Sequence, residues 1–374
     1  MRPARFLLSV LILSAASSAH AQDWASVERE HQRLIASSGI VGSTLALVEG
    51  GAVTQRQDLG WAVVDKRPVD IQTLFHWASI TKTFTGVAVM QLRDRGLISL
   101  EDPIVEYVPE LRQAHNPFGS MQDITVGHLM AHAAGFRGST WPWDGGEDWQ
   151  PWEPTAWSQL VAMMPYTDIA FEPGSRFQYS NPGIVFLGSM IEAVTGDVFE
   201  AYIEKNIFRP LGMRSAYFDV APWHLAEHRS ENYRLVEGSP VANGDFNTGI
   251  TVSNGGLNAT VDDLAKWIGF LTGAVDAPVL SRESLAEMWQ EVVPVGEMEL
   301  GHEGMGLTFW LYPDRGLVGH TGSQRGFFSF MLFDPEEGRG VLATFNTAGG
   351  DETGPDTRAV LNAVRLAAAE YLRE

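Results

Sequence analysis

The 374-residue sequence contains no cysteine. This absence excludes disulfide scaffolds, thiolate zinc sites, iron–sulfur clusters and cysteine nucleophiles. Positive charge is also scarce, since 26 Lys and Arg stand against 46 Asp and Glu, a formal net charge of −20 at pH 7. An acidic surface repels phosphate backbones and anionic lipids. We therefore expect no nucleic-acid binding, and a chemistry carried by Ser, Thr, His, Lys, Tyr or carboxylates.

Long hydrophobic runs are missing beyond the N-terminus. Arg2 and Arg5 precede an apolar stretch over residues 6–16, and Ala19-His20-Ala21 has the form of a cleavage site. This pattern predicts a secretory signal peptide over residues 1–21, because a membrane-spanning helix needs ~20 apolar residues. The alternative is an uncleaved N-terminal anchor. We expect a periplasmic or secreted protein that does not associate with membranes after cleavage.

Strand patterns lie near both ends of the chain, and helical patterns dominate between them. Near the N-terminus we expect one helix followed by a β-hairpin, whose second strand is extended to residue 64. Near the C-terminus we expect four strands and a closing helix. A further helix is expected where Thr260 and Asp263 have capping-box spacing. The helices are expected at 24–38, 257–272 and 357–372, and the strands at 42–48, 52–59, 306–312, 316–320, 327–333 and 340–346.

This order predicts an α+β fold with one antiparallel sheet built from both chain ends. Helices flank the sheet, and a mostly helical subdomain is inserted between the two groups of strands. We expect one domain over residues 22–374, with an α/β part over about 22–78 and 257–374 and a helical part over about 79–256.

The stretch from Ser79 to Lys82 carries the strongest chemical signal. It opens an apolar helix that ends near Gly96, and the three-residue spacing places Lys82 beside Ser79, which is expected in the first helical turn. A serine hydroxyl needs a base within hydrogen-bond reach to become a nucleophile. An exposed lysine is only ~0.04% neutral at pH 7, and burial lowers its pKa. Alone, the S-x-x-K spacing also fits a lysine that simply forms an ion pair in a helix.

Several further motifs occur in the same order as in a known family. The sequence resembles the serine β-lactamase and penicillin-binding-protein superfamily, in its class C-like branch, which includes esterases and D-peptidases. The resemblance covers roughly residues 45–346 and includes, beside Ser79–Lys82, the segments 124–135 (ITVGHLMAHAAG), 172–181 (EPGSRFQYSN), 183–196, 208–213, 255–257 with 263–265, and 319–322 (GHTG).

The resemblance assigns roles to individual residues. It makes Ser79 the nucleophile, Lys82 its base, and Tyr179 the group that shares proton transfer and protonates the leaving group. That role suits a phenol whose pKa a nearby cation lowers. Asn181 corresponds to the residue that hydrogen-bonds the lysine and the substrate amide. The backbone N–H of Ser323 is expected to complete an oxyanion hole with that of Ser79.

One motif departs from the family pattern. β-Lactamases and carboxypeptidases of the superfamily usually carry Lys-Thr-Gly, and this chain carries His320-Thr321-Gly322. The usual lysine is a permanent cation that helps to hold a substrate carboxylate, whereas a histidine is mostly neutral at pH 7. The exchange favours ester or peptide-amide substrates over β-lactams.

Two further groups of residues give weaker indications of function. His128 and His132 have i, i+4 spacing but lack the zinc-protease glutamate, so we expect histidines bonded to backbone and no metal. A Trp-rich segment over residues 141–157 contains Trp143, Trp149 and Trp152. It fits an aromatic wall of the substrate cleft or a loop packed on itself.

The expected function is an exported, monomeric serine hydrolase that acts on an ester or amide, including D-amino-acid peptides, without a cofactor. Its partner is a small-molecule or peptide acyl substrate. Two alternatives stay open. One is a class C-type β-lactamase or D-Ala-D-Ala carboxypeptidase. The other is a penicillin-binding sensor that is acylated without turnover.

Overall fold

The computed structural model describes residues 23–141, 153–349 and 356–373. Its centre is a nine-stranded sheet in the order β3-β2-β1-β14-β13-β12-β11-β10-β9, in which every neighbouring pair is antiparallel. The strands are β1 (Gly42–Glu49), β2 (Ala52–Val63), β3 (Arg67–Pro68), β9 (Val293–Met298), β10 (Gly301–Met305), β11 (Trp310–Tyr312), β12 (Leu317–Gln324), β13 (Phe327–Asp334) and β14 (Arg339–Phe345).

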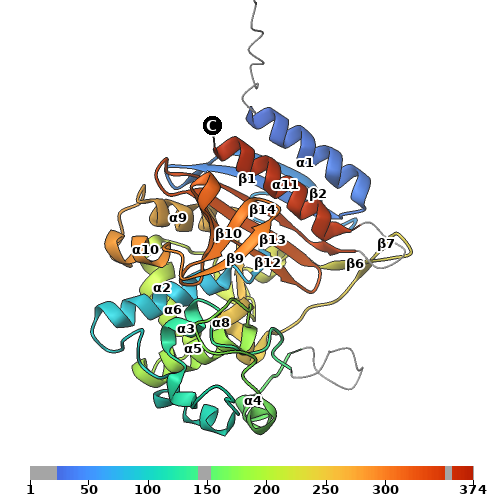
Figure 1. Ribbon diagram of the computed structural model, residues 1–374. Coiled ribbons are helices and arrows are strands. Elements are labelled where there is room, and N and C mark those ends of the chain that lie inside the picture. Colours follow the sequence, from blue (N-terminus) through green and yellow to red (C-terminus); the bar gives the residue numbers. More distant parts are fainter. Residues whose placement is uncertain (1–22, 142–152, 350–355, 374) are drawn as a thin grey trace, which may run out of the picture.

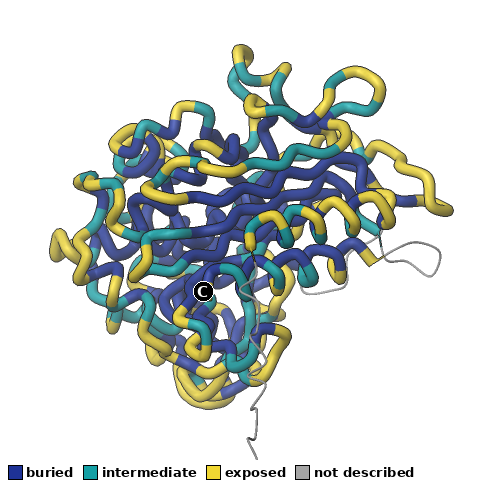
Figure 2. Tube along the Cα trace, turned by 90° about the horizontal axis from the view of Figure 1, so that it is seen from above, coloured by how far each residue is buried: buried dark blue, intermediate teal, exposed yellow. Residues whose placement is uncertain are grey.

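The two ends of the chain meet in the middle of this sheet. Strand β1 pairs with β14 from Ser43↔Phe345 to Glu49↔Arg339. Helices α1 (Trp24–Ser38) and α11 (Thr357–Leu372) lie together on one face, where their apolar sides pack with alternate residues of β1, β13 and β14. Figure 1 shows both helices above the sheet, and Figure 2 shows the central strands buried beneath them. The predicted α+β fold is therefore confirmed.

Helices cover the other face of the sheet. The nearest are α9 (Val261–Thr272) and α2 (Thr81–Asp94), whose residues 81–92 are all buried in the main core. Beyond α2 lie α3 (Val126–Met130), α5 (Asn181–Thr195), α6 (Phe199–Ile203) and α8 (Val252–Gly255) (Figure 1). Thr260 caps α9 as its spacing predicts, because its hydroxyl accepts a hydrogen bond from Asp263 N.

Some element boundaries differ from the prediction. The expected helix over 257–272 is split, because residues 257–259 form β8, which pairs with β4 (Phe75–Ala78) and β5 (Tyr217–Phe218). The segment expected to be mostly helical also contains a hairpin of β6 (Tyr233–Val236) and β7 (Ser239–Ala242). The strand expected from residue 306 begins only at Trp310, after Thr308, which has φ +67°.

The predicted signal peptide, residues 1–21, lies outside the described residues, as do Trp143, Trp149 and Trp152 of the Trp-rich segment. At the edges of that segment, Trp141 is buried, and the Trp157 indole donates a hydrogen bond to Glu110 Oε1. None of the helices in the described ranges is both long enough and apolar enough to cross a membrane.

Candidate active site

Ser79 lies in the turn between β4 and α2. Strand β4 is held extended by β8 up to Ala78, whose φ of +48° is unusual for a residue with a side chain. Helix α2 then begins at Thr81, so Ser79 precedes the helix and the expected place in its first turn is wrong. A hydrogen bond from Lys82 N to Ser79 O closes this turn. The strained backbone at Ala78 is typical of a functional site.

Lys82 is fully buried beside Ser79. Its Nζ donates to Ser79 Oγ over 3.0 Å and to the carbonyl oxygen of Asn254, on α8, over 2.8 Å. Burial lowers the pKa of Lys82 to about 7, and the negative charge of Glu153 offsets part of this effect. A large fraction of the amine is therefore neutral near pH 7, which is the state in which it can accept the serine proton.

Tyr179 completes the group. Lys82 Nζ lies 5.0 Å from the centre of its ring, which stacks on the ring of His132 with the two centres 4.4 Å apart. Burial raises the pKa of Tyr179 above its ordinary value, although hydrogen bonding with Ser79 lowers it in part. The expected lowering of the Tyr179 pKa by a cation is thus wrong, because desolvation of the buried phenol outweighs the hydrogen bond with Ser79. The phenol remains a proton donor at neutral pH.

Asn181 is close to the site but does not contact Lys82 in the expected way. It is the first residue of α5, its carbonyl accepts a hydrogen bond from Asn254 Nδ2 over 3.4 Å, and its N–H donates to Gly138 O. The expected hydrogen bond to Lys82 is replaced by that from Lys82 to the Asn254 carbonyl. Within the described ranges Asn181 Oδ1 is buried without a partner, so it remains available to a substrate N–H.

His320 lies on β12 with 1% of its surface exposed. Its Nδ1 donates to Thr321 O over 2.6 Å, since a carbonyl can only accept, and this fixes Nε2 as the acceptor atom of the ring. Nε2 is buried, with no partner among the described residues. Burial and the nearby Lys82 charge lower the pKa of His320 to about 3. The ring is therefore neutral at any working pH.

Ser323 is exposed on the same strand. Strand β12 passes very close to the residues before Ser79, since a side chain at Gly322 would place its Cβ 2.3 Å from Trp77 O. Only glycine permits that approach. Pairing of β11 with β12 ends at Gly319, so the stretch from His320 to Ser323 continues past the end of β11.

Sequence reasoning missed three contributors to this site. Asn254 supplies a main-chain carbonyl, which no side-chain pattern reveals. His132 was expected to be a buried histidine bonded to backbone, and it does accept from Ser180 N, but its ring also supports Tyr179. Glu153, an acidic residue of the Trp-rich segment, lies within electrostatic range of Lys82. Burial raises the pKa of Glu153 to about 7.

His128 and His132 each accept a hydrogen bond from a backbone N–H. His128 Nδ1 accepts from Thr125 N, the start of the α3 cap, and His132 Nδ1 is engaged by Ser180 N. Among the residues with described positions, no group of three or more His, Asp or Glu could hold a metal ion.

Comparison with known proteins shows the family of the chain. A family model described as Beta-lactamase matches residues 25–365. The chain belongs to the β-lactamase family. Members of this family are generally serine hydrolases, and the resemblance found in the motifs is confirmed.

Individual relatives are distant. The chain is 27% identical to Protein flp of Staphylococcus aureus (strain MW2) over 82% of this chain, and 24% identical to Penicillin-binding protein 4* of Bacillus subtilis (strain 168) over 77% of it. It spans only 60% and 64% of those two proteins. The structure resembles that of the octameric penicillin-binding protein homologue from Pyrococcus abyssi, with a TM-score of 0.77 and 29% identity, over 92% of this chain and 77% of that one.

Proposed function

We propose that the protein is an exported, monomeric serine hydrolase that cleaves esters or amides, including D-amino-acid peptides, through an acyl-enzyme on Ser79. The observation that carries the proposal is the 3.0 Å contact between Ser79 Oγ and a fully buried lysine amine. The amine has a lowered pKa, and its hydrogen-bond partners Ser79 Oγ and Asn254 O are uncharged oxygens, so it can act as a base.

In the first step neutral Lys82 accepts the proton of Ser79, and Ser79 Oγ forms a bond to the substrate carbonyl carbon. The N–H groups of Ser79 and Ser323 stabilise the oxyanion that develops on the carbonyl oxygen. As the intermediate collapses, the bond to the leaving group breaks. The leaving oxygen or nitrogen takes a proton from Tyr179, which is replenished by the protonated Lys82.

In the second step water attacks the acyl carbon, and Lys82 and Tyr179 accept its proton by the reverse route. Bond cleavage releases the acid and returns the proton to Ser79 Oγ. Asn181 Oδ1 and His320 Nε2 are acceptors that have no hydrogen-bond partner among the described residues, so they favour a substrate that presents N–H or O–H donors.

His320 argues against a requirement for a substrate carboxylate. A neutral ring that presents a lone pair repels a carboxylate oxygen instead of binding it. We expect His320→Lys to raise kcat/KM for a peptide with a free C-terminal carboxylate, relative to its C-terminal amide, by about tenfold, since a charge-assisted hydrogen bond contributes about 1.5–3 kcal/mol. The matched control is His320→Gln, which stays uncharged and should leave the ratio unchanged. An unchanged ratio in a folded His320→Lys variant would contradict this role.

The pH dependence follows from Lys82. Activity requires the neutral amine, so kcat/KM for an uncharged ester should rise as the pH increases through about 7 and then level off. The Glu153 carboxylate favours the protonated amine, so Glu153→Gln should move this rise to lower pH. A pH–rate profile from pH 5 to 9 measures both. A rise that stays in place in Glu153→Gln would show that this carboxylate does not act on Lys82.

A substrate panel distinguishes the remaining alternatives. Incubation with p-nitrophenyl acetate and with a chromogenic cephalosporin should give continuous turnover of the ester and slow turnover of the β-lactam. A stoichiometric burst with no steady state on both would instead identify a sensor that is acylated and not released. Faster turnover of the cephalosporin than of the ester would identify a β-lactamase.

A further inference from the structure

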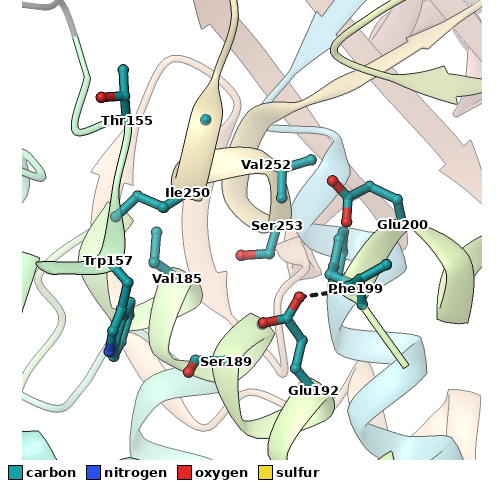
Figure 3. Close-up of a pocket in the computed structure, with 13 residues that line it drawn as sticks. Thr155, Trp157, Val185, Ser189, Glu192, Phe199, Glu200, Ile250, Val252 and Ser253 are labelled. Atoms are coloured by element: carbon teal, nitrogen blue, oxygen red, sulfur yellow. Dashed lines mark hydrogen bonds between the residues drawn. The ribbon is translucent and has the colours of Figure 1, made fainter. Parts of the chain in front are cut away.

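A cavity of about 450 Å³ lies between α5, α6 and the segment that leads into α8. Figure 3 shows its lining residues converging from these elements and from the stretch around Trp157. None of the residues assigned to the reaction lines it. It is therefore separate from the site around Ser79.

Part of the wall of this cavity is apolar, and the rest carries hydroxyl and carboxylate groups. Trp157, Val185, Phe199 and Ile250 line it, and Phe199 and Val185 are almost fully buried. The hydroxyl of Ser253 points into the same space (Figure 3). Apolar side chains of this kind bind a small organic group, whose apolar surface is removed from water on binding.

The charges at the cavity are all negative. Glu192 and Glu200 both line it, and no lysine, arginine or histidine does. One oxygen of Glu192 accepts a hydrogen bond from Phe199 N over 2.9 Å, which fixes the carboxylate at the cavity edge (Figure 3). Neither carboxylate is in an ion pair with another described residue. Two carboxylates beside an apolar wall favour a ligand that carries a positive charge.

The cavity adjoins the segment that contacts Lys82. Ser253 lines it, and the next residue, Asn254, accepts the hydrogen bond of Lys82 Nζ. The Ser253 carbonyl accepts from Thr85 Oγ1, one helical turn beyond Lys82 on α2. Gly188 allows α5 to approach closely, since a Cβ there would lie 2.4 Å from Ser253 Oγ. A ligand in the cavity therefore touches the segment that holds the lysine.

We propose that this cavity is a second binding site, which takes a small organic ammonium ion with an apolar body. The apolar body lies against Trp157, Val185 and Ile250, and the ammonium group lies between Glu192 and Glu200. The 252–254 segment separates the bound cation from Lys82, and the charge of the cation changes the fraction of Lys82 that is protonated. Because like charges repel, the cation favours neutral Lys82, and neutral Lys82 favours the cation.

The test is binding of 2-phenylethylammonium to the Ser79→Ala protein, measured by calorimetry, so that the outcome does not depend on turnover. We expect saturable binding that is at least tenfold tighter than that of the uncharged 2-phenylethanol. Glu192→Gln and Glu200→Gln should each weaken it about three- to tenfold. Glu283→Gln, which removes an exposed carboxylate on α10 (Arg282–Met288), is the matched control for the overall negative charge and should change nothing.

The coupling between the cavity and Lys82 is tested separately, by the pH dependence of ligand binding. Lys82 is faced by Glu153, His132, His320 and Tyr179, and of these His132 and His320 stay neutral. Binding should be about threefold tighter at pH 8 than at pH 6, and Lys82→Met should remove most of this difference. Equal affinity for the ammonium and the alcohol, or no loss in the two glutamate variants, would overturn the site. A pH dependence that survives unchanged in Lys82→Met would overturn the coupling.

Discussion

Ser79→Ala should reduce ester hydrolysis on the order of 10⁴-fold or more, because loss of a nucleophile removes the covalent route altogether. The fold should survive, since Ser79 lies in a turn and its hydroxyl bonds with side chains of the site, Lys82 and Tyr179, and with no element of the sheet among the described residues. The measurement is kcat/KM for p-nitrophenyl acetate, together with the thermal unfolding midpoint.

Covalent labelling sharpens this test. A fluorophosphonate should modify one peptide of the wild-type protein, the one that contains Ser79, and should not label Ser79→Ala. The matched control is Ser37→Ala on α1, an exposed serine whose hydroxyl bonds only its own helix, and this variant should keep full activity. Ester hydrolysis that persists in a folded Ser79→Ala protein would contradict the proposed mechanism.

Lys82→Met should also abolish turnover, and yet it should not lower the stability of the fold. Lys82 is buried among apolar residues of α2 with no carboxylate in an ion pair, so its charged form is disfavoured in the folded state. Replacement by an apolar side chain of similar length removes that cost, and the gain should be up to about 2 kcal/mol. Chemical denaturation measures it.

The sign of the pH effect follows from the lowered pKa. Between pH about 7 and the higher pKa of an unfolded lysine, the unfolded state binds more protons, so the wild-type protein becomes more stable as pH rises. The advantage of Lys82→Met should therefore be larger at pH 6 than at pH 9. Lys266→Met is the contrasting control, since Lys266 forms an ion pair with the buried Asp263 over 2.7 Å. Its loss should destabilise the fold by about 1–3 kcal/mol and leave the activity in place. A lower unfolding midpoint for Lys82→Met would contradict the argument.

The parts of the fold that sequence reasoning found have strong local signals. Strands β13 and β14 are mostly apolar runs on either side of a Pro- and Gly-containing turn, and α11 has a clear apolar face. Strands β9 and β10 were not predicted, because Pro294, Gly296 and Gly304 interrupt the alternation of polar and apolar side chains. A register irregularity also lies between Glu303 and Gly304. Edge strands often carry such interruptions.

The site was predictable to the extent that side chains carry it. Ser79, Lys82 and Tyr179 are brought together from motifs 100 residues apart in the chain. Their electrostatics were not predictable, because the raised pKa of Tyr179 and the acceptor state of His320 depend on burial and on one carbonyl, Thr321 O. The partner of Lys82 is a main-chain atom 172 residues further along, which only the folded chain reveals.

The pairing of β1 with β14 has a consequence for biosynthesis. Ser43 meets Phe345 only when synthesis has passed residue 345, about 300 residues after β1, and β12 and β13 join the sheet in the same stretch. Contacts so distant in sequence form slowly and late. A chain still emerging from the ribosome would thus contain Ser79 without strand β12, which carries His320 and Ser323. Under the proposed mechanism, a truncation before residue 317 should be inactive because it lacks the Ser323 N–H.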